Sequence, residues 1–495
     1  MKLAPDVNQG PTFLANIGHK TSKGIKIFPN FYGLILQPMK SRFTTLVFLV
    51  IFPAALLLTL AAFTIIRSFP QEDLKGKYQY KDFETALKCR SCHPGIYEQW
   101  SQAMMSQAYT HHWDEIEYFE LAVPHAEVNP ALKDPVDGCN GCHSPMAYMV
   151  GKFPPPRPEE KSMANESVSC EVCHLTQRAQ TEPPFNFSYY IEPGRTKYSG
   201  REPEIQSPAH KIVQNDFFRT TEFCGNCHNE KNPYGIWVKS TQLEWKEGPY
   251  AREGVRCQDC HMPKGPYTLA LMGKEREDAR LHLFHGAHDP GKVRGTIELR
   301  IEPDMRLAEP GENIVFRVAL FNQKTGHKFP TGSVEDRIAW LDVEATDAKG
   351  KTYHLDVDKK GFEGEEYTIS GDYLAYQDMG IPLKIKDFKG VQRDGIPYGN
   401  RIFRMPYFDE QGNMTIMQWN TFSQGVDYRI GPRETKVEKF TFKIPYDAAP
   451  GEMKVRAVLN YQLLVKPVAD FLKVPSDESE IIMVNEHSTH VEILP

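Results

Sequence analysis

The sequence predicts an α+β fold in which a mainly helical, loop-rich region is followed by an antiparallel β-sandwich, with one transmembrane helix near the N-terminus. Three observations support this prediction. The pattern Cys-x-x-Cys-His repeats between Cys89 and His261, apolar and polar residues alternate in short runs after Gly291, and an uncharged apolar run covers residues 43–66. The expected organisation is an N-terminal segment at 1–42, a membrane span at 43–66, a motif-bearing domain at 68–290 and a β-sandwich-like domain at 291–495.

The repeated pattern occurs five times and uses all 10 cysteines of the chain. Its spacing is typical of covalent c-type haem attachment, because two thiols three residues apart can bond the two vinyl groups of one porphyrin, and the next histidine can bind the iron. Zinc sites, thiol redox centres and disulfides are the alternatives, but none of them requires a histidine after every pair. We therefore expect five covalently attached haem c groups, whose packing organises the domain. The haem-binding residues are Cys89, Cys92, Cys139, Cys142, Cys170, Cys173, Cys224, Cys227, Cys257 and Cys260, and the iron-binding residues are His93, His143, His174, His228 and His261.

The charge balance argues against a nucleic-acid partner. The 495 residues include 58 Lys and Arg against 64 Asp and Glu, which gives a formal net charge of −6 before any haem propionates are added. A nucleic-acid-binding chain would carry a basic surface instead. The mildly acidic balance favours redox proteins with positive patches as partners, and leaves the oligomeric state open.

The apolar run at 43–66 is long enough to span a bilayer as a helix, and Pro53 should kink that helix without preventing its insertion. A cleaved signal peptide is the alternative, but the run is longer than the usual apolar core of such a peptide. Lys40 and Arg42 before the run predict a cytoplasmic N-terminus. The residues after 67 would then lie on the periplasmic or extracellular side of the cytoplasmic membrane, and we expect translation to begin at Met39.

The rest of the chain divides into two regions with different sequence patterns. Between 68 and 290, short helical signals are divided by Pro and Gly clusters, so iron ligation and porphyrin packing should set the fold there. After Gly291 the alternation predicts half-buried antiparallel strands of a β-sandwich, interrupted by an irregular insertion at roughly 358–425. The predicted strands are GTIELRIEP, NIVFRVALFN, RIAWLDVEAT, KVEKFTFKIP and MKVRAVLNYQL.

A sixth iron ligand for each haem must come from outside the motifs. His210 lies in a turn-rich stretch between two motifs, and His282 and His288 follow the last motif. His327 lies in TGHKFPTG, a rigid turn between two predicted strands, from which it could reach a haem and join the two domains. These four histidines are the first candidates for sixth ligands.

His125 and Met105 are further candidates for sixth ligands. A methionine ligand would raise the potential of its haem, although Met105 could equally pack against a porphyrin as apolar fill. His487 and His490 are expected in a C-terminal tail, away from the haems. A haem without any protein sixth ligand would favour an enzyme over an electron carrier.

Residues 89–290 resemble the multihaem cytochromes c related to the tetrahaem electron acceptor of hydroxylamine oxidoreductase. The resemblance implies closely stacked haems, mostly with two histidine ligands, that pass electrons among themselves. Five motifs instead of four depart from that family, as does Met105 where many relatives have histidine. TGHKFPTG is similar to the start of a C-terminal module in several relatives. The stretches that carry the resemblance are CHPGIYEQWSQAMM, VSCEVCHL, SPAH, EFCGNCHN, STQLEW, GVRCQDCHMP and HLFHGAH.

Together these features predict a membrane-anchored pentahaem cytochrome that carries electrons from a membrane or quinol-linked donor to a periplasmic or extracellular acceptor. Such a carrier needs no catalytic acid, base or nucleophile, because each iron only changes oxidation state. The alternative is a multihaem oxidoreductase that acts on a small nitrogen or sulfur compound at one haem with an open coordination position.

Overall fold

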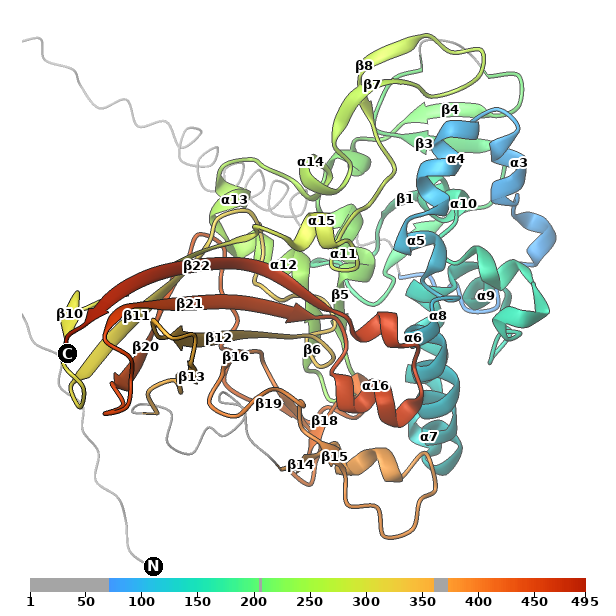
Figure 1. Ribbon diagram of the computed structural model, residues 1–495. Helices are drawn as coiled ribbons and strands as arrows, with labels where there is room; N and C mark the ends of the chain where they lie inside the picture. The colour runs from blue at the N-terminus through green and yellow to red at the C-terminus, as the bar shows by residue number, and fades with distance from the viewer. Residues whose placement is uncertain (1–70, 204–206, 360–372) are drawn as a thin grey trace, which may run out of the picture. The chain divides into compact units, whose positions relative to one another are not determined.

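The computed structural model describes residues 71–203, 207–359 and 373–495, and these described residues form one compact unit (Figure 1). Within these ranges no helix has the length and apolar character needed to cross a membrane. The predicted span at 43–66 and the predicted start at Met39 lie outside the described residues.

Short helices dominate the motif-bearing part of the chain, and local residues explain their ends. α4 and α9 begin with a proline at the first helical position, where the missing N–H costs no helical hydrogen bond. α9 ends at Gly151, whose φ of +79° suits the left-handed cap conformation. The helices are η2 (Tyr80–Asp82), α3 (Ala86–Arg90), α4 (Pro94–Ser101), α5 (Met104–Gln107), α6 (His112–Ile116), η3 (Glu117–Ala122), α7 (Val123–Val128), η4 (Pro130–Leu132), α8 (Lys133–His143), α9 (Pro145–Val150), η5 (Pro158–Glu160), η6 (Met163–Glu166), α10 (Cys170–Leu175), η7 (Asp216–Arg219), α11 (Glu222–His228), α12 (Thr241–Glu247), α13 (Pro249–Arg252), α14 (Cys257–His261) and α15 (Pro290–Val293).

The loops predicted between these helices contain short paired strands, which the sequence did not predict. Three of the pairs are antiparallel, whereas β3 and β4 run parallel. Strands this short give almost no alternation to read, so only the tertiary pairing defines them. They are β1 (Thr176–Ala179) with β2 (Tyr189–Ile191), β3 (Thr196–Ser199) with β4 (Lys211–Gln214), β5 (Asn229–Lys231) with β6 (Trp237–Ser240), and β7 (Lys264–Thr268) with β8 (Glu275–Arg280).

The alternating segments after Gly291 form two larger sheets (Figure 1). One sheet has the order β10-β22-β21-β12-β13, with β16 also paired to β12, and the other has the order β20-β11-β9. Apolar residues from both sheets share one buried cluster, which includes the paired residues Phe316 and Phe440 of one sheet and Leu341 and Leu459 of the other. The strands are β9 (Ile297–Pro303), β10 (Leu307–Ala308), β11 (Asn313–Asn322), β12 (Ile338–Thr346), β13 (Thr352–His354), β16 (Arg401–Phe403), β20 (Thr435–Lys443), β21 (Gly451–Gln462) and β22 (Ile481–Ile493).

The expectation of a C-terminal tail around His487 and His490 is wrong, because both residues lie in β22. This strand pairs with β21 along its whole length and buries Val484 and Val491. The run of polar residues between these two valines hid the alternation in the sequence. β22 also pairs parallel to β10, so the sheet is not purely antiparallel.

The irregular insertion predicted at roughly 358–425 packs against the motif-bearing part through its described residues. Ile416 and Trp419 share a buried cluster with Trp113, Leu121 and Val136, which belong to α6, η3 and α8. This cluster therefore ties the two parts of the compact unit together. Further elements of the insertion are β14 (Leu374–Ala375), η9 (Gln377–Gly380), β15 (Val391–Gln392), β17 (Tyr407–Phe408), β18 (Met414–Thr415), η10 (Gln418–Asn420) and β19 (Ser423–Gln424), whereas α16 (Lys466–Leu472) and η11 (Ser476–Ser479) lie between β21 and β22.

Removing a side chain from this shared cluster should destabilise the protein. Leu121→Ala should lower the free energy of unfolding by about 2–5 kcal/mol, because the leucine is fully buried and leaves a cavity. Denaturant unfolding of the haem-loaded protein, followed by circular dichroism, measures the change. Val128→Ala is the control, since Val128 is 45% exposed and its loss should cost less than about 0.5 kcal/mol. Equal shifts in the two variants would contradict the role given to the cluster.

Candidate haem-binding site

The five motifs, numbered 1 to 5 in chain order, each lie on a short helix. Motif 1 continues from α3 into the following turn, and α8, α10, α11 and α14 carry motifs 2 to 5. Helical geometry places residues three and four positions apart on one face. The two cysteines and the histidine of each motif can therefore bind the same group. All 10 cysteines are free thiols.

All five motif histidines line one continuous cavity of about 2310 Å³. A site for a single small molecule usually measures about 300–1,000 Å³, so this cavity has the size for several groups. Its walls also carry many basic side chains, which suit the propionate carboxylates of haem. Examples are Lys88, Lys197, Lys239, Arg256, Arg280 and Arg337.

Backbone carbonyls fix the orientation of four motif histidines. A carbonyl can only accept a hydrogen bond, so the Nδ1 of each of these histidines carries the hydrogen and donates it. The other ring nitrogen, Nε2, keeps its lone pair for a metal. The donor–acceptor pairs are His93 with the Leu269 carbonyl at 2.6 Å, His143 with Ala108 at 2.7 Å, His174 with Tyr198 at 2.8 Å and His261 with His285 at 2.7 Å.

Three motif histidines face a second histidine from elsewhere in the chain. The ring centroids of His93 and His210 are 6.3 Å apart. The same distance, 6.3 Å, separates His174 from His282, with the two rings inclined by 23°. For the rings of His261 and His327 the separation is 6.5 Å and the inclination is 16°. The structure thus brings three of the predicted sixth-ligand histidines opposite a motif histidine.

These separations match two imidazoles that bind one iron from opposite sides. A first-row metal binds an imidazole nitrogen at about 2.0–2.1 Å, and that nitrogen lies roughly 1.15 Å from the centre of a ring with bonds of about 1.35 Å. Two rings on opposite sides of one metal should therefore have centroids about 6.3 Å apart. The observed distances leave room for an iron in each of the three pairs.

Burial keeps several of these imidazoles neutral at pH 7. It lowers the pKa of His228, His261 and His282 to about 4 in each case. A neutral imidazole can donate its lone pair to a metal without first losing a proton. Burial also lowers the pKa values of His174, His210 and His327.

Contacts between cysteines give the spatial order of the motifs. Side-chain interactions join Cys89 of motif 1 to Cys170 of motif 3, and Cys224 of motif 4 to Cys257 of motif 5. Cys173 of motif 3 also acts electrostatically on Cys224 of motif 4. A further side-chain interaction joins motif 2 to motif 4, through Cys142 and Cys227. Motifs 1, 3, 4 and 5 thus form a series, and motif 2 branches from motif 4.

In the described part of the chain, no ring contact places another histidine opposite His143 or His228. Met105 lines the cavity and also packs beside an apolar cluster around Val168 and Leu175. Its contacts suit apolar packing as well as iron ligation.

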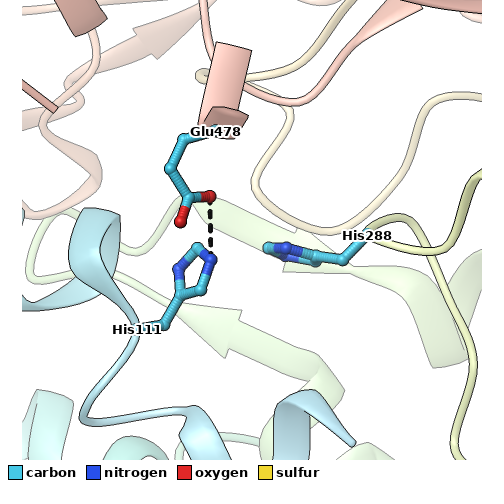
Figure 2. Close-up of side chains that lie close together, drawn as sticks. All are labelled: His111, His288 and Glu478. Carbon is cyan, nitrogen blue, oxygen red and sulfur yellow. Dashed lines mark ion pairs between the residues drawn. The ribbon is translucent and has the colours of Figure 1, made fainter. Parts of the chain in front are cut away.

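Two predicted ligands do not face a motif histidine. His125 is buried in α7, where its Nδ1 accepts a hydrogen bond of 3.0 Å from the Trp419 indole, and it does not line the cavity. His288 lines the cavity but lies beside His111, with ring centroids 4.9 Å apart, and near Glu478 (Figure 2). Sequence reasoning missed this group, because its members come from segments far apart in the chain.

Two protein-family models match the chain. The model described as cytochrome c554 and c-prime matches residues 88–175, which contain motifs 1 to 3. The model described as the N-terminal region of the NapC/NirT cytochrome c family matches residues 211–292, which contain motifs 4 and 5. No curated protein sequence matches the chain.

Solved structures include one with a similar fold. A penta-haem cytochrome c552 from Thermochromatium tepidum has a TM-score of 0.58 and 20% sequence identity, over 83% of this chain and 99% of that one. Spo0M from Bacillus subtilis covers 40% of this chain and 49% of its own at 12% identity, with a TM-score of 0.17. A CARDB domain from Pyrococcus furiosus covers 40% of this chain and 87% of its own at 10% identity, also with a TM-score of 0.17. The last two scores are too low to bear on the fold. The motifs, the facing imidazoles and the two family matches together describe a multihaem c-type cytochrome, a protein that transfers electrons.

Proposed function

We propose that this chain is a membrane-anchored pentahaem cytochrome that transfers electrons between a membrane or quinol-linked donor and a periplasmic or extracellular acceptor. The relation to the electron acceptor of hydroxylamine oxidoreductase is part of this proposal. When bound, each haem supplies an iron that gains or loses one electron. The protein binds the haems, orients their ligands and fixes their order.

The three facing imidazole pairs carry the proposal. Their separations of 6.3, 6.3 and 6.5 Å suit irons with two histidine ligands, which leave no position for a substrate. We assign His210, His282 and His327 as the sixth ligands for motifs 1, 3 and 5. Saturated coordination favours electron transfer over chemistry at these irons.

The order of the motifs suggests where electrons enter and leave. The series runs from motif 1 through motifs 3 and 4 to motif 5. The two exposed cysteines of the motifs, Cys92 and Cys260, belong to the two ends of this series. A partner could therefore approach either terminal haem, while the haems between them stay covered.

Membrane attachment rests on the apolar run at 43–66. Its length and lack of charge suit a single span, and Lys40 and Arg42 favour a cytoplasmic start. The cytochrome would then be held on the outer face of the cytoplasmic membrane, close to a quinol-linked donor.

Removing a proposed sixth ligand should change the spin state of one haem. His282→Ala should convert the motif 3 haem from low spin to high spin, because the iron loses one strong-field imidazole. Electron paramagnetic resonance of the oxidised protein detects the new signal. His285→Ala is the matched control three residues away. The side chain of His285 pairs with Asp289 at 3.1 Å, and its backbone carbonyl survives the substitution. An unchanged spectrum in His282→Ala would refute the assignment.

Electron flow should depend on motif 4 but not on motif 2. A photoreductant attached at Met272→Cys would inject electrons beside motif 1, because Met272 is 92% exposed and the N–H of its neighbour Leu271 donates to the Cys92 carbonyl. Without motif 2 (Cys139→Ala with Cys142→Ala), all remaining haems should be reduced in the fast phase. Without motif 4 (Cys224→Ala with Cys227→Ala), only the haems of motifs 1 and 3 should be reduced in the fast phase. Transient absorption measures the two phases, and equal fast phases would contradict the proposed order.

The surroundings of His228 favour a second function, an oxidoreductase acting on a small nitrogen or sulfur compound. In the described residues no ring contact places another histidine opposite His228, and the charges of Lys239 and Arg337 act on it. Such cations could hold an anion beside an open iron position. If this function holds, cyanide and nitrite should shift the absorption spectrum of one haem in the oxidised wild-type protein, and the shift should weaken in Arg337→Gln. An absorption spectrum that neither cyanide nor nitrite changes would refute the oxidoreductase function and leave electron transfer as the proposed function.

A further inference from the structure

A second cluster of metal-ligand side chains lies outside the facing imidazole pairs. The donor atoms of His111, His288 and Glu478 all lie within 4.8 Å of one another (Figure 2). They come from three separate segments: the residue before α6, the loop before α15, and η11. The fold therefore brings together two imidazoles and one carboxylate.

The two imidazoles are placed differently from those of the facing pairs. Their centroids are 4.9 Å apart and their planes are inclined by 86°. Two imidazoles that share one ion at a near-tetrahedral angle of about 100–110° should have centroids about 4.8–5.2 Å apart. The separation thus suits neighbouring ligands of one small cation and is too short for opposite ligands of a haem iron.

The polar contacts of His111 match those of a metal-binding histidine. Its Nε2 lies 2.8 Å from a carboxylate oxygen of Glu478, and its Nδ1 lies 3.2 Å from one of Asp114. Metal-bound histidines usually direct their second ring nitrogen to a carboxylate, which fixes the ring. Asp114 is placed to act in this way while Nε2 and Glu478 bind the ion.

Charge and burial also favour a cation here. The side chains of His111 and Glu478 are each only 9% exposed. Two carboxylates, from Asp114 and Glu478, lie 3.2 and 2.8 Å from His111 and would offset the charge of a bound dication, while the charge of Arg337 also acts on His288. Among the described residues, the ring nitrogens of His288 have no hydrogen-bond partner. One of them is free to be the remaining protein ligand.

We propose that His111, His288 and Glu478 bind a divalent cation of the zinc class, with Asp114 orienting His111. Two histidines, one carboxylate and an open fourth position form a ligand set that suits Zn²⁺. The ion would join the motif-bearing part of the chain to η11, and this link would be additional to those made by the haems.

Metal analysis of the intact, haem-loaded protein tests the proposal. After treatment with a chelator and dialysis against Zn²⁺, the wild-type protein should retain about one zinc ion per chain. Glu478→Gln keeps the size of the side chain but removes its charge, and should weaken zinc binding at least about 100-fold. Glu480→Gln makes the same change at an exposed position two residues away and should bind zinc like the wild type. Equal zinc retention in the wild type and Glu478→Gln would overturn the proposal.

The haem spectrum separates this site from a haem ligand. His288→Ala should lose zinc while the haem spin states stay unchanged. A new high-spin haem signal in His288→Ala would instead assign His288 to a haem iron and refute the zinc site.

A third readout rests on the proposed haem at motif 2. Asp114 also lies 3.7 Å from the Nδ1 of His143, so zinc should raise the reduction potential of that haem. The shift should be absent in Glu478→Gln. If zinc binds without changing that reduction potential, the coupling to motif 2 is refuted. The number of zinc ions bound per chain tests the metal site independently of the proposed function.

Discussion

The fixed separation between facing imidazoles is the constraint on which the rest of the structure depends. An iron with two histidine ligands accepts little variation in the distance between them, so under the proposed assignment each facing pair would set the distance between two remote segments. The pairs also overlap along the chain: His174 precedes His210, and His261 precedes His282. Opening one pair would therefore strain the next. With iron bound in each pair, these overlapping links would span the chain from His93 to His327 and reinforce the short helices and apolar clusters.

The short strands around the motifs have a clear purpose in this arrangement. Tyr198 of β3 and Leu269, directly after β7, supply carbonyl oxygens that accept hydrogen bonds from His174 and His93. A carbonyl in a paired strand is held more firmly than one in an unpaired loop. The pairing of β3 with β4, and of β7 with β8 just before Leu269, thus helps to fix which ring nitrogen of His174 and His93 faces the cavity, and burial lowers the pKa of His174.

The sequence predicts the features that depend on residues close together in the chain. Five motifs of fixed spacing mark the candidate haem sites, and alternation marks β9, β11, β12, β20 and β21 to within about two residues. His210 and His327 were predicted from the turns around them and His282 from its place after the last motif, and the structure brings each opposite a motif histidine. His125 was a candidate only because it is a histidine, and its Nδ1 accepts a hydrogen bond from the Trp419 indole instead.

Features defined by contacts between remote segments could not be predicted. β22 carries too many polar residues to alternate visibly, and its long pairing with β21 defines it. The spatial order of the motifs depends on which helices meet, as does the group formed by His111, His288 and Glu478. No local pattern in the sequence records either arrangement.

The place of His327 links the last motif to the sheet-rich part of the chain. Its partner His261 belongs to the last motif, yet His327 itself lies beyond β11 in the sheet-rich part. Under the proposed assignment, the ligands of the motif 1 haem are complete once residue 210 has been synthesised, whereas those of the motif 5 haem also require a turn of the later sheet. The motif 5 site would then be complete only when the C-terminal sheets fold, so the last haem would report on the fold of the sheet-rich part.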